Sequence, residues 1–279
     1  MRMLKAIFSH TSGRIGGAIV LVYLAVAVLA MLGITPHDPL MQYRIDRLHP
    51  PSAVYWMGTD LFGRDVASRL MEGIAQSFTV GFLSVAVAAL AGTVLGLFAA
   101  WLGGRWDGLV MRIMDVLLAF PAILLALLIV AIVGPGTWTS VAAIGIVYTP
   151  IFTRVVRGPA LSLKARDFVD AARTFGSSRS YILTHHLLLN LVAPLTVQVT
   201  LALAWALLTE AGLSFLGLGT QPPASSLGLM LSDSRNLMET APWLMIFPGL
   251  AIMISILGFN LLGDALRDIL DPKTRRAMA

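Results

Sequence analysis

The sequence predicts an all-α integral membrane protein with six transmembrane helices. Hydrophobic residues make up 57% of the 279 residues and charged residues only 13%, whereas soluble domains carry roughly 25% charged residues. The mean hydropathy is +0.81, and apolar runs reach the length of about 20 residues that crosses a bilayer as a helix. This composition excludes an ordinary soluble enzyme, a disordered protein and a nucleic-acid-binding protein. We expect membrane lipids, and no nucleic acid, around the chain.

Six apolar runs are the predicted spans. In chain order they cover residues 15–34, 78–102, 113–133, 138–156, 191–216 and 243–262. The third run contains Pro121, and the fourth is the least apolar. Because backbone polar groups in lipid must bond within their own segment, we expect all six to be helices. The first run exceeds the roughly 7–15 apolar residues of a signal peptide, which predicts an uncleaved span.

The basic residues predict which side of the membrane each loop faces. If the N-terminus lies inside, 15 of the 20 Lys and Arg residues fall in inside segments. The remaining five, in the outside segments, are Arg44, Arg47, Arg64, Arg69 and Arg235. Because Lys and Arg are enriched in cytoplasmic loops, this bias predicts that both termini are cytoplasmic.

Two outside segments are long enough to hold structure. Residues 35–77 begin with a proline-rich stretch, which predicts extended, turn-rich backbone. Val66, Leu70 and Ile74 then recur at helical spacing, so we expect a short helix on the outer surface over residues 65–77. The second segment covers residues 217–242. We divide the chain into 1–73 (first span and outer loop), 74–263 (transmembrane domain) and 264–279 (cytoplasmic tail).

A ridge of small residues follows the second span, with Ala88, Gly92, Gly96 and Ala100 at every fourth position. Such spacing lets two helix backbones approach closely. The ridge predicts either packing within the chain or a face between two copies, and we favour packing within the chain.

The inside loop of residues 157–190 predicts a helical hairpin. An apolar stripe falls at helical spacing and consists of Phe168, Ala171, Ala172 and Phe175. Gly176 follows as a helix-ending residue, and Ser177 or Ser178 can cap a second helix. The alternative is a solvated connector. We favour a surface for a partner protein, because an apolar stripe needs something to cover it.

This hairpin carries the first resemblance to a known family. It reads DAARTFG at 170–176 and, nine residues later, HLLLN at 186–190. It resembles the EAA loop of permease subunits of binding-protein-dependent ABC importers, in which Glu-Ala-Ala precedes a Gly and, later, Ile-Leu-Pro. Asp170 stands at the Glu position with a shorter acidic side chain. Leu189 stands at the Pro position, which removes a potential kink and allows the second helix to run further.

Three more runs resemble the dipeptide, oligopeptide and nickel permeases of that family. They are WMGTDLFGRDV at 56–66, LSFLGLG at 213–219, and FPGL at 247–250 with FNLLGDALRD at 259–268. The first is similar to the outer-loop signature, here Gly58, Thr59, Asp60, Gly63, Arg64 and Asp65. The chain is similar to the second permease of a pair, which implies a type I ABC importer transmembrane domain with a cytoplasmic coupling helix.

The resemblance implies a complex in the bacterial plasma (inner) membrane. It would contain a second homologous permease, two ATPase subunits that bind ATP and Mg, and a periplasmic or lipid-anchored solute-binding protein. The coupling helix would hold the ATPase through Phe168, Asp170, Ala171, Ala172, Phe175 and Gly176. The solute would be di- or oligopeptides, with nickel or another small solute as the alternative.

The chain itself is expected to be no enzyme. A phosphate-cradling loop needs Gly-Lys-Ser/Thr, but only Lys5, Lys164 and Lys273 are present and none follows a glycine. We therefore expect no catalytic residue and no cofactor here. We also expect no metal, because there is no cysteine, and the adjacent His185 and His186 point in different directions on a helix.

Charged residues within the spans are candidate functional groups. Glu210, near the outer end of the fifth span, is with Ser214 a candidate for the outer gate or the solute path. The alternative is a structural carboxylate satisfied by nearby hydroxyls or backbone. Asp115 is expected to pair with Arg112, three residues earlier on the same helix.

Two other classes of membrane protein compete with this interpretation. A secondary transporter would more often show inverted repeats and broken helices, and no convincing repeat is visible in the sequence. A Gly-x-Ser-x-Gly motif of an intramembrane protease is absent, because the glycine after Ser214 comes one residue too late, at Gly217.

Overall fold

The computed structural model describes residues 10–270, and within that range the chain consists of helices and connecting loops. Five helical stretches in it are long and apolar enough to cross a membrane. They are α2 (Thr11–Met31), α3 (Val66–Leu102), α6 (Thr137–Lys164), the run Arg179–Phe215 and α11 (Trp243–Leu270). The bent pair α4 (Gly104–Leu118) and α5 (Ala122–Val133) is a sixth if counted as one span. The predicted all-α membrane class is confirmed.

The third predicted span is not one straight helix. α4 and α5 meet at an angle of 91°, with the break at Ala119, Phe120 and Pro121. Pro121 has no N–H for a helical hydrogen bond, and it restricts Phe120 to extended backbone. The prediction of one continuous helix through Pro121 is therefore wrong.

The short surface helix expected over residues 65–77 is also wrong as a separate element. Its residues form the first turns of α3, which continues to Leu102. Asp65 begins the helix by accepting a hydrogen bond from Ser68 N, and no proline interrupts the next 37 residues. Gly73 lies inside α3 where α10 (Leu227–Ser234) packs against the helix: a Cβ at Gly73 would lie 3.3 Å from Leu227 N.

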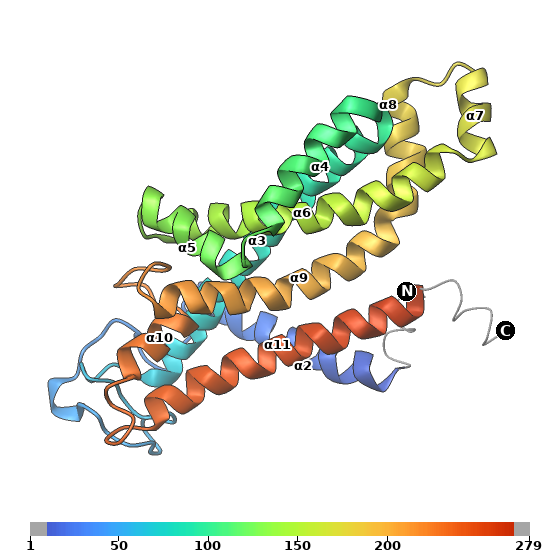
Figure 1. Cartoon of the computed structure of the whole chain (residues 1–279). Coiled ribbons are helices and arrows are strands. Elements are labelled where there is room, and N and C mark those ends of the chain that lie inside the picture. The colour runs from blue at the N-terminus through green and yellow to red at the C-terminus, as the bar shows by residue number, and fades with distance from the viewer. Residues whose placement is uncertain (1–9, 271–279) are drawn as a thin grey trace.

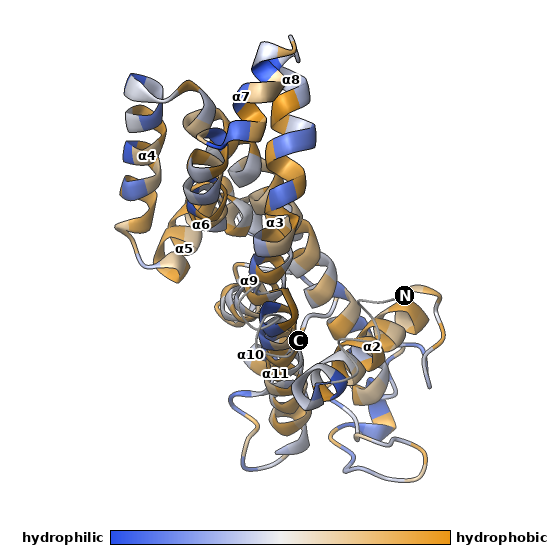
Figure 2. Ribbon diagram, turned by 90° about the vertical axis from the view of Figure 1, so that its right-hand side faces the viewer, coloured by the Kyte–Doolittle hydropathy of each residue, from blue (hydrophilic) through white to orange (hydrophobic). Residues whose placement is uncertain are grey.

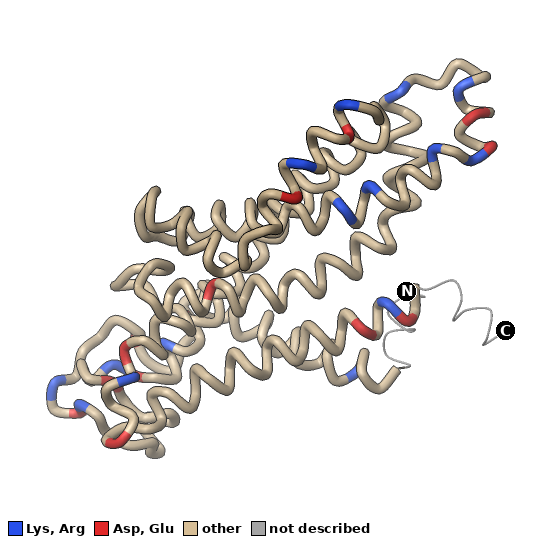
Figure 3. The backbone as a smooth tube through the Cα atoms, in the orientation of Figure 1, with Lys and Arg blue, Asp and Glu red and all other residues tan. Residues whose placement is uncertain are grey.

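The helices run between two polar ends (Figure 1). One end holds α7 (Asp167–Thr174) and α8 (Arg179–Tyr181); the other holds α10 and the loops around residues 35–65 and 216–242. Hydrophilic residues gather towards these ends and hydrophobic residues between them (Figure 2). The charged residues follow the same division (Figure 3). Part of the basic cluster behind the predicted topology lies outside the described residues: Arg2, Lys5, Lys273, Arg275 and Arg276.

The small-residue ridge packs within the chain, as favoured from the sequence. All four ridge residues on α3 are buried. A Cβ at Gly96 would lie 2.7 Å from the carbonyl oxygen of Thr153 and 2.9 Å from Val156 Cβ, both on α6. The ridge therefore brings the α3 and α6 backbones into contact at a distance that only glycine permits.

The hairpin leads without a break into the fifth span. α8 is followed by a π-helical turn, Ile182–Leu188, and then by α9 (Leu189–Phe215), so that residues 179–215 form one helical rod. Leu189 keeps helical backbone at the position where the resembling family has proline. The second helix of the hairpin therefore continues through Leu189 into α9.

Candidate functional site

The predicted coupling hairpin has an inner and an outer face. Val169 on α7 is fully buried, together with Ile182, Leu187 and Leu191, and Ala172 packs partly buried against this cluster. On the outer side, Phe175 is 89% exposed and Phe168 38%. Three of the four stripe residues, Phe168, Ala171 and Phe175, are therefore exposed, although the Phe168 ring also contacts His186. Ala172 instead faces the bundle.

Gly176 ends α7 in the predicted way. Its φ of +78° is left-handed, a conformation that favours glycine. Its N–H donates to Arg173 O at 3.0 Å, and Ser177 N donates to Ala172 O at 3.0 Å. This pair of bonds is a Schellman motif, which satisfies the last carbonyls of the helix. Ser178 then caps the second helix by accepting from Tyr181 N at 3.2 Å.

Two basic side chains attach the hairpin to the end of α3. Lys164 Nζ donates to the carbonyl oxygens of Ala100 at 3.0 Å and Trp101 at 2.6 Å. A cation is favourable there because helix C-termini carry partial negative charge. The guanidinium of Arg173 stacks over the Trp101 ring, 5.2 Å from its centroid, and pairs with Asp170 at 3.0 Å. These contacts orient the hairpin relative to the bundle.

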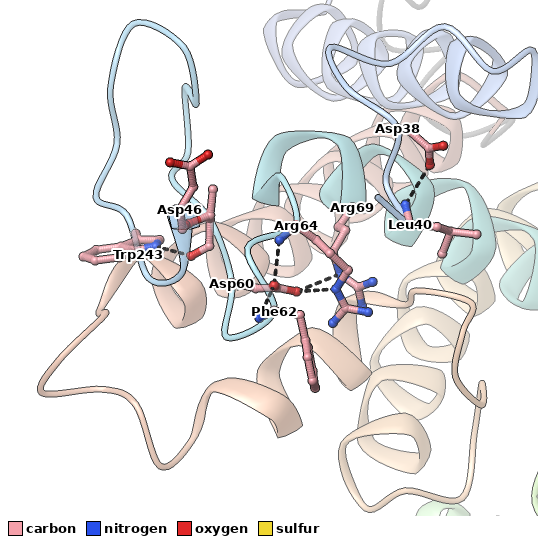
Figure 4. Close-up of polar contacts among 9 residues, drawn as sticks. Asp38, Leu40, Asp46, Asp60, Phe62, Arg64, Arg69 and Trp243 are labelled. Atoms are coloured by element: carbon pink, nitrogen blue, oxygen red, sulfur yellow. Dashed lines mark hydrogen bonds and ion pairs between the residues drawn. The ribbon is translucent and has the colours of Figure 1, made fainter. Parts of the chain in front are cut away.

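The outer-loop signature is a network of hydrogen bonds around the start of α3. Asp60 Oδ1 accepts from Phe62 N at 2.8 Å and Arg64 N at 2.9 Å, and its Oδ2 accepts from Arg64 Nε at 2.7 Å. The same Oδ2 lies 3.6 Å from Nε of Arg69, a buried arginine of α3 (Figure 4). Asp65 caps α3 by accepting from the N and Oγ of Ser68, at 2.9 and 2.6 Å.

Thr59 joins this loop to more distant parts of the chain. It is fully buried; its N–H donates to His49 O, its Oγ1 donates to Asp46 O, and its carbonyl accepts from Trp243 Nε1 at 3.3 Å. Gly58, with a φ of +75°, leaves no room for a side chain: a Cβ would lie 2.7 Å from both His49 O and Trp243 Nε1. The signature residues therefore fix the shape of the loop.

Two further features belong to this outer region. A cavity of about 210 Å³ lies between the signature loop and α10, lined among others by Asp60, Arg64 and Arg69. Tyr55, on the same loop, is buried and donates to Asp46 Oδ2 at 3.0 Å. Burial, with this hydrogen bond, raises the pKa of Tyr55 above its ordinary value.

Glu210 and Ser214 meet one helical turn apart on α9. Both side chains are fully buried, and Ser214 Oγ donates to Glu210 Oε1 at 2.7 Å. Ser214 Oγ also accepts from Thr220 N at 3.1 Å. The predicted pair is therefore brought together, in a buried position between α9 and the segment that follows it.

Asp115 pairs differently from the prediction. Its partner is Arg154 on α6, at 2.6 Å, and not Arg112. A second pair, Asp107 with Arg157, joins the same two helices, with Nη2 to Oδ2 at 2.5 Å. Both pairs hold α4 to α6. Among residues 10–270, no group of three or more His, Asp or Glu side chains is placed to hold a metal ion.

The chain is similar to transport proteins over most of its length. Residues 92–276 match the family described as "Binding-protein-dependent transport system inner membrane component". The dipeptide transport system permease protein DppC of Alkalihalophilus pseudofirmus is 46% identical over 262 residues, which cover 94% of this chain and 86% of that protein. The chain belongs to this family of transport permeases.

Other similar proteins give the same result. The probable D,D-dipeptide permease DdpC of Escherichia coli K12 is 41% identical, covering 92% of this chain and 86% of that protein. The glutathione permease GsiD of Pectobacterium atrosepticum is 44% identical, covering 93% and 86%. An inward-facing structure of the MetNI methionine ABC transporter has a TM-score of 0.56 at 18% identity, covering 73% of this chain and 96% of that chain. The chain is thus a multi-pass permease component of an ABC importer.

Several residues that shape these sites of the permease were missed in the sequence. Val169 anchors the hairpin but stands next to the larger apolar Phe168, so the apolar stripe was drawn through Phe168 and left Val169 out. Arg69 was counted as a loop charge, because the start of α3 was assigned to the outer surface. The pairs of Asp115 with Arg154 and of Asp107 with Arg157 join residues 39 and 50 positions apart in the chain, so local sequence patterns do not reveal them.

Proposed function

We propose that this permease forms, with a second homologous permease, the translocation path of an ATP-driven importer for di- or oligopeptides. The observation that carries the proposal is the likeness over more than nine-tenths of the chain to proteins named as dipeptide and D,D-dipeptide permeases. A solute-binding protein outside the membrane delivers the solute, in line with the description of the family.

In this proposal the hairpin is the surface that binds the ATPase. Its outer face presents Phe168, Ala171 and Phe175, while Val169 and the Schellman turn hold its shape. Exposed apolar side chains on a rigid, otherwise polar element are typical of a protein interface. ATP binding moves the hairpin, and α9 moves with it because the two are one continuous rod. The permease pair then alternates between inward- and outward-facing states.

The orientation of the chain completes the proposal. The hairpin end of the bundle faces the cytoplasm, where ATP is available, and the loops around 35–65 and 216–242 face outwards. The distribution of Lys and Arg residues supports this topology in the bacterial inner membrane, with both termini inside.

Uptake by a purified system tests the function. The permease, its partner permease, the ATPases and the binding protein are reconstituted in liposomes, and accumulation of a labelled dipeptide is compared with accumulation of ⁶³Ni²⁺. We expect dipeptide uptake that requires ATP inside the liposomes. Uptake of nickel but not of the dipeptide would contradict the peptide assignment, and uptake driven by an ion gradient without ATP would contradict the importer class.

A further inference from the structure

A buried carboxyl group holds together the outer part of the permease. Glu210 is fully buried on α9, and its Oε1 accepts from Ser214 Oγ at 2.7 Å. Its other oxygen, Oε2, makes no hydrogen bond of normal geometry, but the hydroxyls of Ser77 and Ser226 lie beside the carboxyl group. A buried carboxyl is costly unless neighbouring polar groups satisfy it, so three surrounding hydroxyls indicate a specific role.

Each of the three serines also accepts a hydrogen bond from the backbone. Ser214 Oγ accepts from Thr220 N at 3.1 Å, Ser77 Oγ from Leu227 N at 3.3 Å, and Ser226 Oγ from Leu229 N at 3.2 Å. The three N–H groups belong to the segment 216–226 and to the first turn of α10. Glu210 is thus at the centre of a network that joins α3, α9 and the outer segment.

The outer segment lies directly on α9 beside this network. Gly219 and Gly228 leave no space for a Cβ, because Ser214 and the backbone of Ala211, respectively, would collide with it. α10 therefore packs on the last turns of α9, and the network supplies its polar attachment.

The same α9 begins at the hairpin. Residues 179–215 form one helical rod with the hairpin at one end and Glu210 close to the other. A displacement of the hairpin is passed directly along the rod to α10 if α10 stays fixed to it. Glu210 and its three serines supply the side-chain attachment at that joint, beside the backbone bonds from Leu218 N and Gly219 N to Leu213 O.

We propose that Glu210 is a positioning residue that fixes the outer segment 216–234 to α9, so that this segment moves with the hairpin. The carboxyl group acts through the three serine hydroxyls, which in turn hold the backbone of the segment. The attachment itself is a property of this chain. Its role in coupling rests on the proposed function.

A buried reporter tests the attachment in the purified chain. Ser225 is 2% exposed and its Oγ has no hydrogen-bond partner, so Ser225→Cys changes little in a chain without cysteine. We expect a hydrophilic maleimide to react slowly at position 225 in otherwise native protein. Glu210→Ala should raise the rate of the maleimide reaction about tenfold or more. The serine hydroxyls lose the carboxyl group that accepts from them, and the segment that they hold then opens locally. An unchanged rate would overturn the proposal.

Three matched variants separate the attachment from general damage. Glu239→Ala removes an exposed carboxylate of the outer region and should leave the rate unchanged. Ser255→Cys on α11 is equally buried, at 2%, and should stay protected when Glu210 is replaced. If Glu210→Ala makes both cysteine reporters reactive, the milder Ser214→Ala is compared in its place. Ser214→Ala must make position 225 reactive and leave position 255 protected, and any other result contradicts the attachment. Glu210→Gln keeps an acceptor oxygen and should retain protection; if it exposed position 225 as fully as Ala, the hydrogen-bond account would be wrong.

The coupling role is tested in the reconstituted importer. Glu210→Ala should lower the dipeptide uptake per ATP hydrolysed about tenfold, whereas Glu239→Ala should not. If position 225 became reactive but the uptake per ATP hydrolysed stayed unchanged, Glu210 would only attach the segment locally. The proposal that the segment moves with the hairpin would then be wrong. If the native importer showed no ATP-dependent uptake, the proposed function would fail, and the reactivity of position 225 would still decide the attachment.

Discussion

Truncation of Phe175 is the most specific test of the hairpin surface. This side chain is 89% exposed at the end of α7, and the bonds that hold the Schellman turn come from the backbone. Phe175→Ser should therefore leave the hairpin folded and remove apolar area from the interface. A phenylalanine contributes about 150–250 Å², which at about 25 cal/mol per Å² sets an upper value of about 4–6 kcal/mol.

The measured loss should be smaller than this upper value, because an interface rarely covers a side chain completely and truncation of an anchor residue typically costs about 2 kcal/mol or more. We expect the permease pair to bind the ATPase about 30-fold more weakly, as measured by titrating ATPase onto the immobilised pair in detergent. Trp138→Ser, which removes a 74% exposed aromatic residue from the other end of α6, serves as the control. Equal ATPase affinity of the Phe175 variant and native protein would refute the assignment of this surface.

Three further predictions follow from the same geometry. The chain purified alone should hydrolyse no ATP, and turnover that survives removal of contaminating ATPases would contradict the assignment of hydrolysis to separate subunits. Leu61→Cys, at a 46% exposed position of the outer loop, should react with an impermeant thiol reagent in spheroplasts, and labelling only after lysis would reverse the topology. Gly96→Leu should destabilise the bundle by about 1–3 kcal/mol or more, because Thr153 and Val156 occupy the space, as a fall in Tm and in monodisperse yield would show. A native-like Tm would mean that α3 and α6 separate more easily than the structure indicates.

Thr59, in the same loop as Leu61, shows what the sequence leaves hidden. Its place in a polar, glycine-containing loop predicts an exposed side chain. In the structure Thr59 is completely buried, and its carbonyl accepts a hydrogen bond from Trp243, which lies 184 residues away along the chain. A contact of this kind leaves no signal in local composition or periodicity.

Much of the fold was predictable because each span is marked by its own composition. Apolar length identifies the helices, and the small residues of α3 identify its packing face. Gly176 was predictable as a helix end because left-handed backbone favours glycine. These signals are local in the sequence, so they can be read without knowing which other segments pack against them.

Other features depend on partners that are distant in the sequence. The packing of α4 on α6 joins Asp115 to Arg154 and Asp107 to Arg157, which lie 39 and 50 residues apart in the chain. Which apolar residues of α7 face the bundle depends on where Ile182 and Leu187 lie. The apolar spacing alone therefore did not reveal that Val169 and Ala172 pack inwards. The hydroxyls around Glu210 come from three separate segments, and only the folded chain brings them together.

ATP-dependent uptake of a labelled dipeptide by the reconstituted importer is the measurement that decides the proposed function. We expect accumulation that needs this permease, its partner, the ATPases, the binding protein and ATP on the hairpin side. We also expect Phe175→Ser to lower that accumulation in proportion to the ATPase lost from the complex. Accumulation that continues without ATP, or that follows an ion gradient instead, would show that the chain is not part of an ATP-driven importer.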